Sequence, residues 1–401
     1  MDMKLNILKL FRRRSRLVIF AFVVCLVVAN ILGVFIHPFE VDFSTNFSYP
    51  LDINNFRDII EVIKYSKLSK DKSQDKSQDI YLNHHIKQIP KPINYYNYRY
   101  IIKNENKCSK TDPKTDLNRN KSSDNSRTHS SEEITLLIVV KSALNNFEAR
   151  NAIRKSWGFE NRFSDVIIKR VFILGKCLDR TDVVDCQDRI DEESEENKDI
   201  IQSDFTDTYY NNTIKTMVAF KWVVEYCSGA EFILFVDDDY YVSVKNLLKY
   251  VRNPINGSPV LLSNSVQSDP YVFDGRLYTG FVFASSSPLR HRTSKWFVSL
   301  EEYPFSKYPP YVTAGAFVLN NVSLIDMHFA SLYTKHFRFD DIYVGILAKK
   351  LSIFPIHCEK FHFWSYSYEP MKYSDVIASH GFHDPKHLLL SWNQQKSMGN
   401  A

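Results

Sequence analysis

The chain has 401 residues, of which 44% are hydrophobic and 14% aromatic, and its formal net charge is +5. This composition supplies enough apolar surface for one large domain or two smaller ones. The cationic residues are spread along the chain and do not form a stripe with interleaved aromatic side chains. We therefore exclude a nucleic-acid-binding protein and expect no nucleic-acid partner.

The first predicted element is an apolar run of twenty residues, 17–36, broken only by Asn30. About 20 residues of helix are long enough to cross a bilayer core. Cations precede the run and Glu40 and Asp42 follow it, so the positive-inside rule places residues 1–16 in the cytosol. A cleaved signal peptide is the alternative, but the run is too long and no small-x-small cleavage site follows. We predict a type II signal anchor at residues 17–36, with the rest of the chain in the lumen of a secretory compartment.

Cysteines and glycosylation sequons agree with a secretory compartment. Five of the six cysteines lie beyond the apolar run, so disulfides are expected there. Because five is odd, at least one luminal thiol stays free or pairs with another chain, and the pairing cannot be read from sequence. The spacing of cysteines and histidines matches no zinc site. The candidate glycosylation sites are Asn46, Asn120, Asn211, Asn256 and Asn321.

Residues 37–133 are rich in Lys, Asp, Asn, Ser and Gln, and Lys-Ser-Gln-Asp is repeated at 72–79. Such a segment buries too little apolar area to offset chain entropy, so it is typical of a stem. Its last part carries an aromatic cluster, Tyr95, Tyr96, Tyr98 and Tyr100, which favours packing of this part on the domain that follows. The sequence leaves open whether the stem forms a homodimer.

From residue 134 to 401, strand-like runs alternate with helical patterns, which predicts an α/β domain with a mostly parallel central sheet. We expect strands at 134–141 and 166–174, and helices at 147–157 and 213–227. The second helix has a well-defined buried face, formed by Ile214, Met217, Val218 and Trp222. An acidic loop is expected near 191–196. A short apolar strand then begins at residue 231.

That strand ends in three consecutive carboxylates, Asp237, Asp238 and Asp239. Like charges this close repel one another, so the triplet indicates a bound cation, most simply one that also holds phosphates. A lone D-x-D match is more often a solvated turn or a helix cap. At the carboxyl end of a buried strand, however, it lies where open α/β sheets bind ligands. We favour Asp239 as the direct metal ligand, with Asp237 its natural pair and Asp238 able to reach either the cation or the sugar.

Several ordered blocks between residues 134 and 393 resemble the β1,3-glycosyltransferases, glycosyltransferase family 31. The blocks are RNAIRKSWG at 150–158, FILG at 172–175, DFTDTYYNNTIKT at 204–216, the Asp triplet, YPPYVTAGAF at 308–317 and FDDIYVG at 339–345. Two of them, TAGAF and the tail IASHGF at 377–382, are most similar to the brainiac branch. The resemblance implies a GT-A fold and an inverting transferase that moves N-acetylglucosamine or galactose from a UDP-sugar to a 3-hydroxyl. The branch slightly favours N-acetylglucosamine transfer onto β-mannose of a glycolipid core, with glycoprotein as the other acceptor class.

Two groups of residues are candidates for donor binding. Arg150 and Arg154 lie four apart on one helix face, so both can reach a diphosphate or uracil; surface cations paired with Glu148 or Glu160 are the alternative. Asp204, Asp207 and Lys215 flank the start of the next helix, where free N–H groups and a lysine suit phosphate. Simple N-capping by Asp207 or Asn211 is the alternative there.

Candidates for a sugar platform are Tyr311, Gly315 and Trp296. The Tyr-Pro-Pro-Tyr sequence fixes two φ angles and presents rings, and the small residues around Gly315 let backbone approach a ligand closely. A structural turn and a half-buried core tryptophan are the alternatives.

Asp340 and Asp341 open a helical stretch and could simply cap it. The resemblance makes one of them the general base, and we favour Asp341 with Asp340 as fallback. It also implies that His380 completes the shell of a divalent cation, most simply Mn²⁺, with His383 competing for that role. An inactive, glycan-binding or chaperone-like luminal protein is the alternative function. The acidic triplet, the base candidate and the arginine pair together argue against it.

Overall fold

The computed structural model describes residues 2–43, 56–68, 91–109, 135–177, 183–252 and 275–401. The chain forms two compact units, of which the smaller is Met1–Ser48 with Ser285–Pro309. The larger unit is Tyr49–Ala284 with Pro310–Ala401, and it holds most of the predicted site. Each unit is described by itself.

The smaller unit contains helix α1, Asp2–Ile31, and the short 3-10 helix η1, His37–Phe39. The apolar run was predicted to be helical to residue 36, but α1 ends at Ile31 and residues 32–36 form turns. Gly33 has a φ of +78°, and a Cβ there would lie 2.5 Å from the Arg290 carbonyl oxygen, so the backbone reverses where only glycine fits. Within the described parts of the chain, no helix combines the length and the apolarity needed to cross a membrane.

The larger unit is built on an eight-stranded sheet in the order β1-β4-β3-β2-β5-β8-β7-β9. The strands of this sheet are β1 (Tyr100–Ile102), β2 (Leu136–Lys141), β3 (Ile168–Lys176), β4 (Ile200–Thr206), β5 (Phe232–Asp237), β7 (Tyr278–Phe283), β8 (Tyr311–Asn320) and β9 (Ile356–His357). A second sheet has three strands, β6 (Tyr240–Val242), β10 (Phe361–Ser365) and β11 (Ala378–His380).

The prediction of a mostly parallel sheet is wrong, because the large sheet is mixed. Strands β4, β3, β2 and β5 are parallel to one another, as the alternating pattern predicted. Beyond β5, however, β8 is antiparallel to both β5 and β7, and β1 is antiparallel to β4. These pairings join segments far apart in the chain, and an alternation of local patterns does not encode them.

The predicted helices at 147–157 and 213–227 are confirmed as α5 and α7. The acidic stretch predicted as a loop is instead helical, since glutamate is a good helix former and Ile190 supplies a buried contact. The helices of the larger unit are α3 (Phe56–Leu68), α5 (Phe147–Lys155), α6 (Val183–Asn197), the 3-10 helix η4 (Tyr209–Asn211), α7 (Asn212–Tyr226), α8 (Val244–Val251), α9 (Asn321–Leu332), α10 (Asp340–Lys350) and α11 (Pro385–Ser397).

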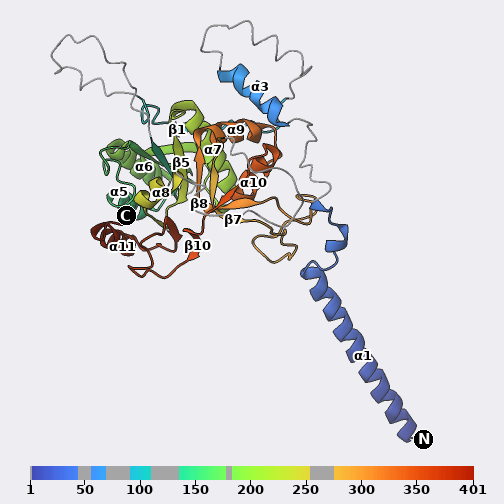
Figure 1. The fold of residues 1–401 in the computed structure, drawn as a ribbon. Helices are drawn as coiled ribbons and strands as arrows, with labels where there is room; N and C mark the ends of the chain where they lie inside the picture. Colours follow the sequence, from blue (N-terminus) through green and yellow to red (C-terminus); the bar gives the residue numbers. More distant parts are fainter. Residues whose placement is uncertain (1, 44–55, 69–90, 110–134, 178–182, 253–274) are drawn as a thin grey trace, which may run out of the picture. The chain divides into compact units, whose positions relative to one another are not determined.

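Helices cover the sheet in two groups, with α7, α9 and α10 packed together and α11 packed on α5 (Figure 1). All six residues of β2 are buried, and Phe235 stacks on Phe317 with ring centroids 4.8 Å apart. Two segments of the predicted stem belong to the same unit: α3 packs on α9, and β1 pairs with β4. The tyrosine-rich end of the stem thus packs on the domain.

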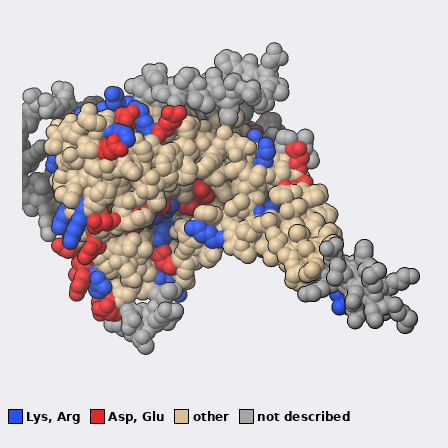
Figure 2. Space-filling view, turned by 90° about the horizontal axis from the view of Figure 1, so that it is seen from below, with Lys and Arg blue, Asp and Glu red and all other residues tan. Residues whose placement is uncertain are grey.

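Two disulfides, Cys108–Cys227 and Cys177–Cys186, lie in the larger unit. The odd luminal thiol expected from the cysteine count is Cys358, which is buried and free. Figure 2 shows acidic and basic side chains in small mixed groups on one face of the molecule. That face presents no large field of positive charge.

Candidate active site

The three carboxylates at the end of β5 meet three different sets of partners. Because β5 is parallel to β2, Asp237 lies in register with Lys141, the last residue of β2. Lys141 Nζ is 3.1 Å from Asp237 and 2.9 Å from Asp340, and it also donates to the carbonyl of Ala314. Lys141 thereby links the end of β5 to the first turn of α10.

Charge is balanced within this group. Burial alone would lower the pKa of Lys141, but the ion pairs with Asp237 and Asp340 raise it, so the ammonium stays charged. Partial burial raises the pKa of Asp237 to about 7; the nearby carboxylates of Asp239 and Asp340 add to this effect, and Lys141 opposes it. Asp340 also accepts a hydrogen bond from Thr216 Oγ1 at 3.0 Å, so one oxygen of this carboxylate has two protein partners. Sequence reasoning missed Lys141; a lysine that ends an apolar strand was the available signal.

Asp238 holds the loop that follows β2. Its Oδ2 accepts from Ser142 Oγ at 2.6 Å, from Asn146 Nδ2 at 2.9 Å and from the Ala143 amide at 3.3 Å. This carboxylate therefore fixes the backbone between β2 and α5. Its predicted contact with the donor stays a prediction.

Asp239 faces two histidines. Strand β11 is antiparallel to β6 and places His380 opposite Tyr240, so its imidazole reaches Asp239 from the neighbouring segment. Asp239 Oδ2 is 3.1 Å from His380 Nε2 and 3.2 Å from His383 Nδ1. The hydrogen bond to Asp239 raises the pKa of His380 above its ordinary value. The structure thus brings together Asp239 and both histidines that the sequence had offered as competitors.

These three residues fit a divalent cation. One ligand atom from each lies within 4.8 Å of the others, and Asp239 Oδ1 is buried without a hydrogen-bond partner among the described residues. A buried acceptor without a donor is costly unless something else satisfies it. One carboxylate and two imidazoles form a donor set that divalent transition metals accept.

A cleft of about 530 Å³ opens directly beside this cluster. Asp238, Asp239 and His383 line it on one side and Asn146 and Phe147, at the start of α5, on another. The guanidinium of Arg189 lies 4.2 Å from the centroid of the Phe147 ring. The cleft thus joins carboxylate, imidazole, guanidinium and an aromatic ring at the carboxyl edge of the parallel strands, where open α/β sheets bind ligands.

The two base candidates differ in access. Asp340 is buried and paired with Lys141, whereas Asp341 is partly exposed. Asp341 Oδ1 accepts from the Ile342 amide at 2.8 Å, in the first turn of α10. Burial raises the pKa of Asp341 to about 7, and the neighbouring Asp340 adds to the shift. A general base needs a pKa near the working pH and access to the reacting proton, and the pKa and partial exposure of Asp341 meet both requirements.

Arg150 is buried and Arg154 is partly buried, and carboxylates missed by sequence reasoning pair with both. Arg150 donates to Glu193 at 2.7 Å and to the carbonyls of Ala143 and Leu144, so it supports the loop that Asp238 also holds. Arg154 pairs with Asp199 at 2.8 Å and with Glu193 at 2.7 Å. Neither Glu148 nor Glu160 fills this role.

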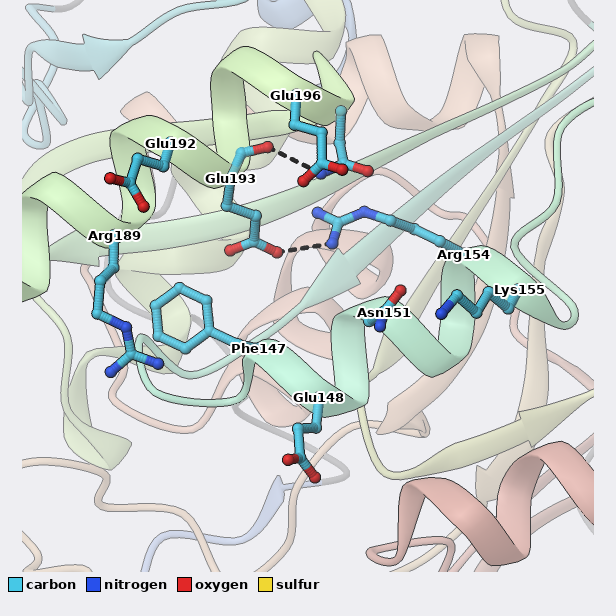
Figure 3. Close-up of a pocket in the computed structure, with 10 residues that line it drawn as sticks. Phe147, Glu148, Asn151, Arg154, Lys155, Arg189, Glu192, Glu193 and Glu196 are labelled. Carbon is cyan, nitrogen blue, oxygen red and sulfur yellow. Dashed lines mark hydrogen bonds and ion pairs between the residues drawn. The ribbon is translucent and has the colours of Figure 1, made fainter.

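Figure 3 shows Arg154 turned toward Glu193 in a second cavity of about 670 Å³, between α5 and α6. Phe147 and Arg189 line both this cavity and the cleft beside Asp239. Arg154 lines this cavity and not the cleft beside Asp239, and its contact with a donor stays a prediction.

The donor-binding candidates Asp204, Asp207 and Lys215 lie in two different places. Asp207 pairs with Lys215 at 2.8 Å and accepts from the Gly175 amide, and Lys215 donates to the carbonyl of Ser142 at 2.7 Å. Both side chains are therefore close to the end of β2. Asp204 lies elsewhere, with its carboxylate 3.2 Å from Arg99.

The predicted sugar platform is largely covered by protein. A Cβ at Gly315 would lie 2.0 Å from the hydroxyl of Tyr240, so the close approach there is made by a tyrosine ring. Tyr311 is buried and packs closely on Gly345 of α10. Trp296 is 48% exposed and belongs to the smaller unit.

Three of the sequon asparagines, Asn46, Asn120 and Asn256, lie outside the described residues. Asn211 donates through Nδ2 to the Thr206 carbonyl at 2.8 Å, and Asn321 donates in the same way to the carbonyl of Ser228. Glycosylation of either residue stays a prediction.

Comparison with known proteins identifies the family. The family model described as galactosyltransferase matches residues 148–359. Over 268 residues the chain is 46% identical to beta-1,3-galactosyltransferase brn of Drosophila melanogaster, covering 66% of this chain and 76% of that relative. It is 36% identical over 250 residues to beta-1,3-galactosyltransferase bre-5 of Caenorhabditis elegans, covering 62% and 71%.

Solved structures give a weaker likeness. The galactosyltransferase LgtC, in complex with donor and acceptor sugar analogs, aligns with 65% of this chain and 95% of its own, at 13% identity and a TM-score of 0.32. We draw no conclusion about fold or function from a TM-score this low.

The chain belongs to the galactosyltransferase family, and it is a glycosyltransferase. Membership identifies the mixed-sheet α/β domain as GT-A-like and implies a nucleotide-sugar donor and a glycan acceptor. The alternative of a non-catalytic glycan-binding protein is set aside.

Proposed function

We propose that the protein is an inverting β1,3-hexosyltransferase that moves galactose or N-acetylglucosamine from UDP to the 3-hydroxyl of a glycan on lipid or protein. One observation carries the proposal. A donor set for a divalent cation, Asp239 with His380 and His383, lies at the same sheet edge as the partly exposed carboxylate of Asp341. Lys141 joins the two parts, since it contacts both Asp237 and Asp340.

Asp239, His380 and His383 would hold the cation, which we propose to be Mn²⁺. Bound there, it would neutralise charge on the diphosphate of the donor and on the departing UDP. The cleft of about 530 Å³ beside Asp239 is large enough for part of a nucleotide, and Arg189 adds a positive charge to its lining.

Asp341 is the proposed general base. Its carboxylate accepts the proton of the acceptor 3-hydroxyl while that oxygen forms a bond to the anomeric carbon. The bond between the anomeric carbon and the phosphate oxygen breaks on the opposite face, and its electron pair leaves with UDP. The product has inverted configuration, which gives the β1,3 linkage from an α-linked donor. Lys141 stabilises the neighbouring negative charge of Asp340 throughout, so the proton is taken by the less constrained carboxylate.

Two donors are in competition. The names of the fly and worm relatives support galactose. The resemblance of the TAGAF and IASHGF blocks to the brainiac branch supports N-acetylglucosamine transfer onto β-mannose. A donor screen decides between the two sugars.

We also propose that the catalytic unit works in the Golgi lumen, tethered through the apolar segment 17–36 in a type II orientation. Two disulfides in the larger unit support an oxidising compartment. The cations that precede residue 17 support a cytosolic N-terminus.

The test is a donor screen with the full chain, which measures UDP release from UDP-galactose and UDP-N-acetylglucosamine with β-mannoside and β-galactoside acceptors, with and without Mn²⁺. We expect Mn²⁺-dependent transfer from one donor and inverted configuration in the product. Asp239→Asn and Asp341→Asn should each lower kcat by at least about 100-fold.

Asp375→Asn is the matched control, because that carboxylate is exposed and lies 3.5 Å from Lys360, outside the cleft. Unchanged turnover in both site variants would refute the assignment of base and cation ligand. No transfer from either donor to either acceptor by the wild-type chain would refute the proposed reaction.

A further inference from the structure

A third pocket, of about 570 Å³, lies where the end of the predicted stem packs on the domain. We call it the tyrosine pocket and define it by Tyr95, Tyr96, Asn97 and Tyr98 together with Asp204 and His336, all of which line it. The proposed chemistry uses none of these residues, although the sequence had offered the carboxylate of Asp204 for donor binding.

The tyrosine pocket lies at the carboxyl end of the parallel strands, the same end of the sheet as the carboxylate cluster. Strand β1 is antiparallel to β4, so the residues that precede Tyr100 lie beside the carboxyl end of β4, and the Asp204 amide donates to the Arg99 carbonyl at 3.0 Å. The parallel strands β4, β3, β2 and β5 all end at this edge, as does the carboxylate cluster.

Helices α7 and α10 connect the tyrosine pocket to the base. Ile214 of α7 lines the pocket, and Thr216, two residues later, donates to Asp340 at 3.0 Å. The hydroxyl of Tyr96 donates to that of Tyr343 at 3.2 Å, and Tyr343 lies on α10, the helix that begins with Asp340 and Asp341. The wall of the pocket is thus built on the same two helices that position the carboxylates.

The segment that forms the pocket is fixed in place. The Ile93 amide donates to the Leu332 carbonyl at 2.8 Å, and Asn94 Nδ2 donates to the Ser331 carbonyl at 2.8 Å. Tyr98 meets Phe205 edge to face, with ring centroids 6.0 Å apart. A ligand would therefore meet a preorganised surface, which lowers the entropy cost of binding.

The lining of the tyrosine pocket suits a neutral, hydroxyl-rich ligand. Tyr95 is 60% exposed, and the side chain of Asn97 is also exposed, so a ring and an amide are both available. None of the described residues that line the pocket is a lysine or arginine, and the one carboxylate, Asp204, is paired with Arg99. Burial lowers the pKa of His336, which keeps its imidazole uncharged at neutral pH. Tyrosine rings pack on the apolar faces of pyranose rings, while amides bind their hydroxyls.

We propose that the tyrosine pocket is a subsite for the inner sugars of the acceptor, those that precede the sugar bearing the reactive 3-hydroxyl. This inference rests on the proposed function, because it assumes that the acceptor is a glycan whose terminal sugar reaches Asp341. It assigns the end of the stem a part in acceptor selection: an acceptor of several sugars spans from the base to the pocket, and a monosaccharide does not.

The test compares two acceptors with the full chain, a methyl β-glycoside monosaccharide and a trisaccharide that ends in the same sugar. We expect the wild-type KM to be at least about tenfold lower for the trisaccharide, with similar kcat. Tyr95→Ala and Tyr98→Ala should raise the KM of the trisaccharide about tenfold and leave the KM of the donor unchanged. Tyr95→Phe, which keeps the ring, should retain most of the preference.

Phe159→Ala is the matched control, since Phe159 is 49% exposed but follows α5, at the opposite edge of the sheet. Three outcomes would overturn the subsite: no preference for the trisaccharide in the wild-type chain, an undiminished preference in both tyrosine-to-alanine variants, or an equal loss for both acceptors. Failure of the wild-type chain to glycosylate the monosaccharide and the trisaccharide alike would instead count against the proposed function, so the two failures are distinguishable.

Discussion

The ion pairs of Lys141 give the sharpest test of how the site is assembled. Replacing Lys141 with methionine keeps the apolar stem and removes the charge that Asp237 and Asp340 share. Lys141 is 6% exposed and Asp340 is also 6% exposed, so the variant leaves a buried carboxylate without its cation. Breaking a buried ion pair in this way costs roughly 3–5 kcal/mol.

The structure places the expected cost near the lower end of that range, at about 3 kcal/mol. The Asp237 side chain is 39% exposed, so water can hydrate its carboxylate when Lys141 is removed, and the loss of this ion pair costs little free energy of unfolding. Asp340 keeps the hydrogen bond from Thr216, which offsets part of the remaining cost. Adding Asp340→Asn to Lys141→Met removes the unpaired negative charge. Because the two side chains are in direct contact, the second substitution should restore about 1–3 kcal/mol of the free energy of unfolding.

Urea unfolding of the full chain, followed by tryptophan fluorescence under non-reducing conditions, measures these differences. Lys249→Met, at an exposed lysine in the last turn of α8, removes the same charge without a buried partner and should change the free energy of unfolding by less than about 0.5 kcal/mol. The reasoning fails if Lys141→Met costs no more than this control. It also fails if the double variant is as unstable as the sum of its single variants.

Two further predictions concern the base and the disulfides. Burial raises the pKa of Asp341 to about 7, so this carboxylate is deprotonated above that pH and increasingly protonated below it. Because the base acts in its deprotonated form, kcat at saturating donor and acceptor should fall about tenfold per pH unit below 7 and level off above 8. A kcat profile that is flat between pH 5 and 8 would contradict a base with this pKa. Loss of the Cys108–Cys227 bond, which spans 119 residues, should destabilise the chain by roughly 5 kcal/mol, and loss of Cys177–Cys186, which spans 9, by roughly 2.6 kcal/mol, if the entropy of the unfolded chain sets the cost. Urea unfolding of Cys108→Ser/Cys227→Ser and Cys177→Ser/Cys186→Ser measures both, and a larger effect of the short loop would count against that account.

Local patterns predicted the part of the fold that depends on local sequence. The alternation between residues 134 and 237 predicted β2, α5, β3, α7 and β5 to within about two residues. The antiparallel strands β8 and β7 were not predicted, because β8 pairs with β5 at positions some 80 residues apart, and β7 in turn pairs with β8. The helix at Val183–Asn197 was missed because its acidic face suggested solvent, whereas Glu193 is buried against Arg150.

The site shows the same division. Residue types and motif order predicted Asp239, His380 and Asp341, and the structure places them at one edge of the sheet. The partners that control these groups could not be read from sequence. Lys141 lies about 200 residues before Asp340, and Glu193 about 40 residues after Arg150. Such contacts depend on the packing of strands and helices, and a single sequence contains no local signal of them.

The acidic triplet illustrates how the structure changes the physical argument. From sequence, the mutual repulsion of three carboxylates indicated a bound cation. In the structure, Lys141 neutralises Asp237, the loop after β2 donates three hydrogen bonds to Asp238, and His380 and His383 face Asp239. Protein groups therefore stabilise the end of β5 on their own. Among the oxygens of the triplet, Asp239 Oδ1 is the buried one without a partner in the described chain, so the protein groups that stabilise the strand end leave this oxygen available to a cation.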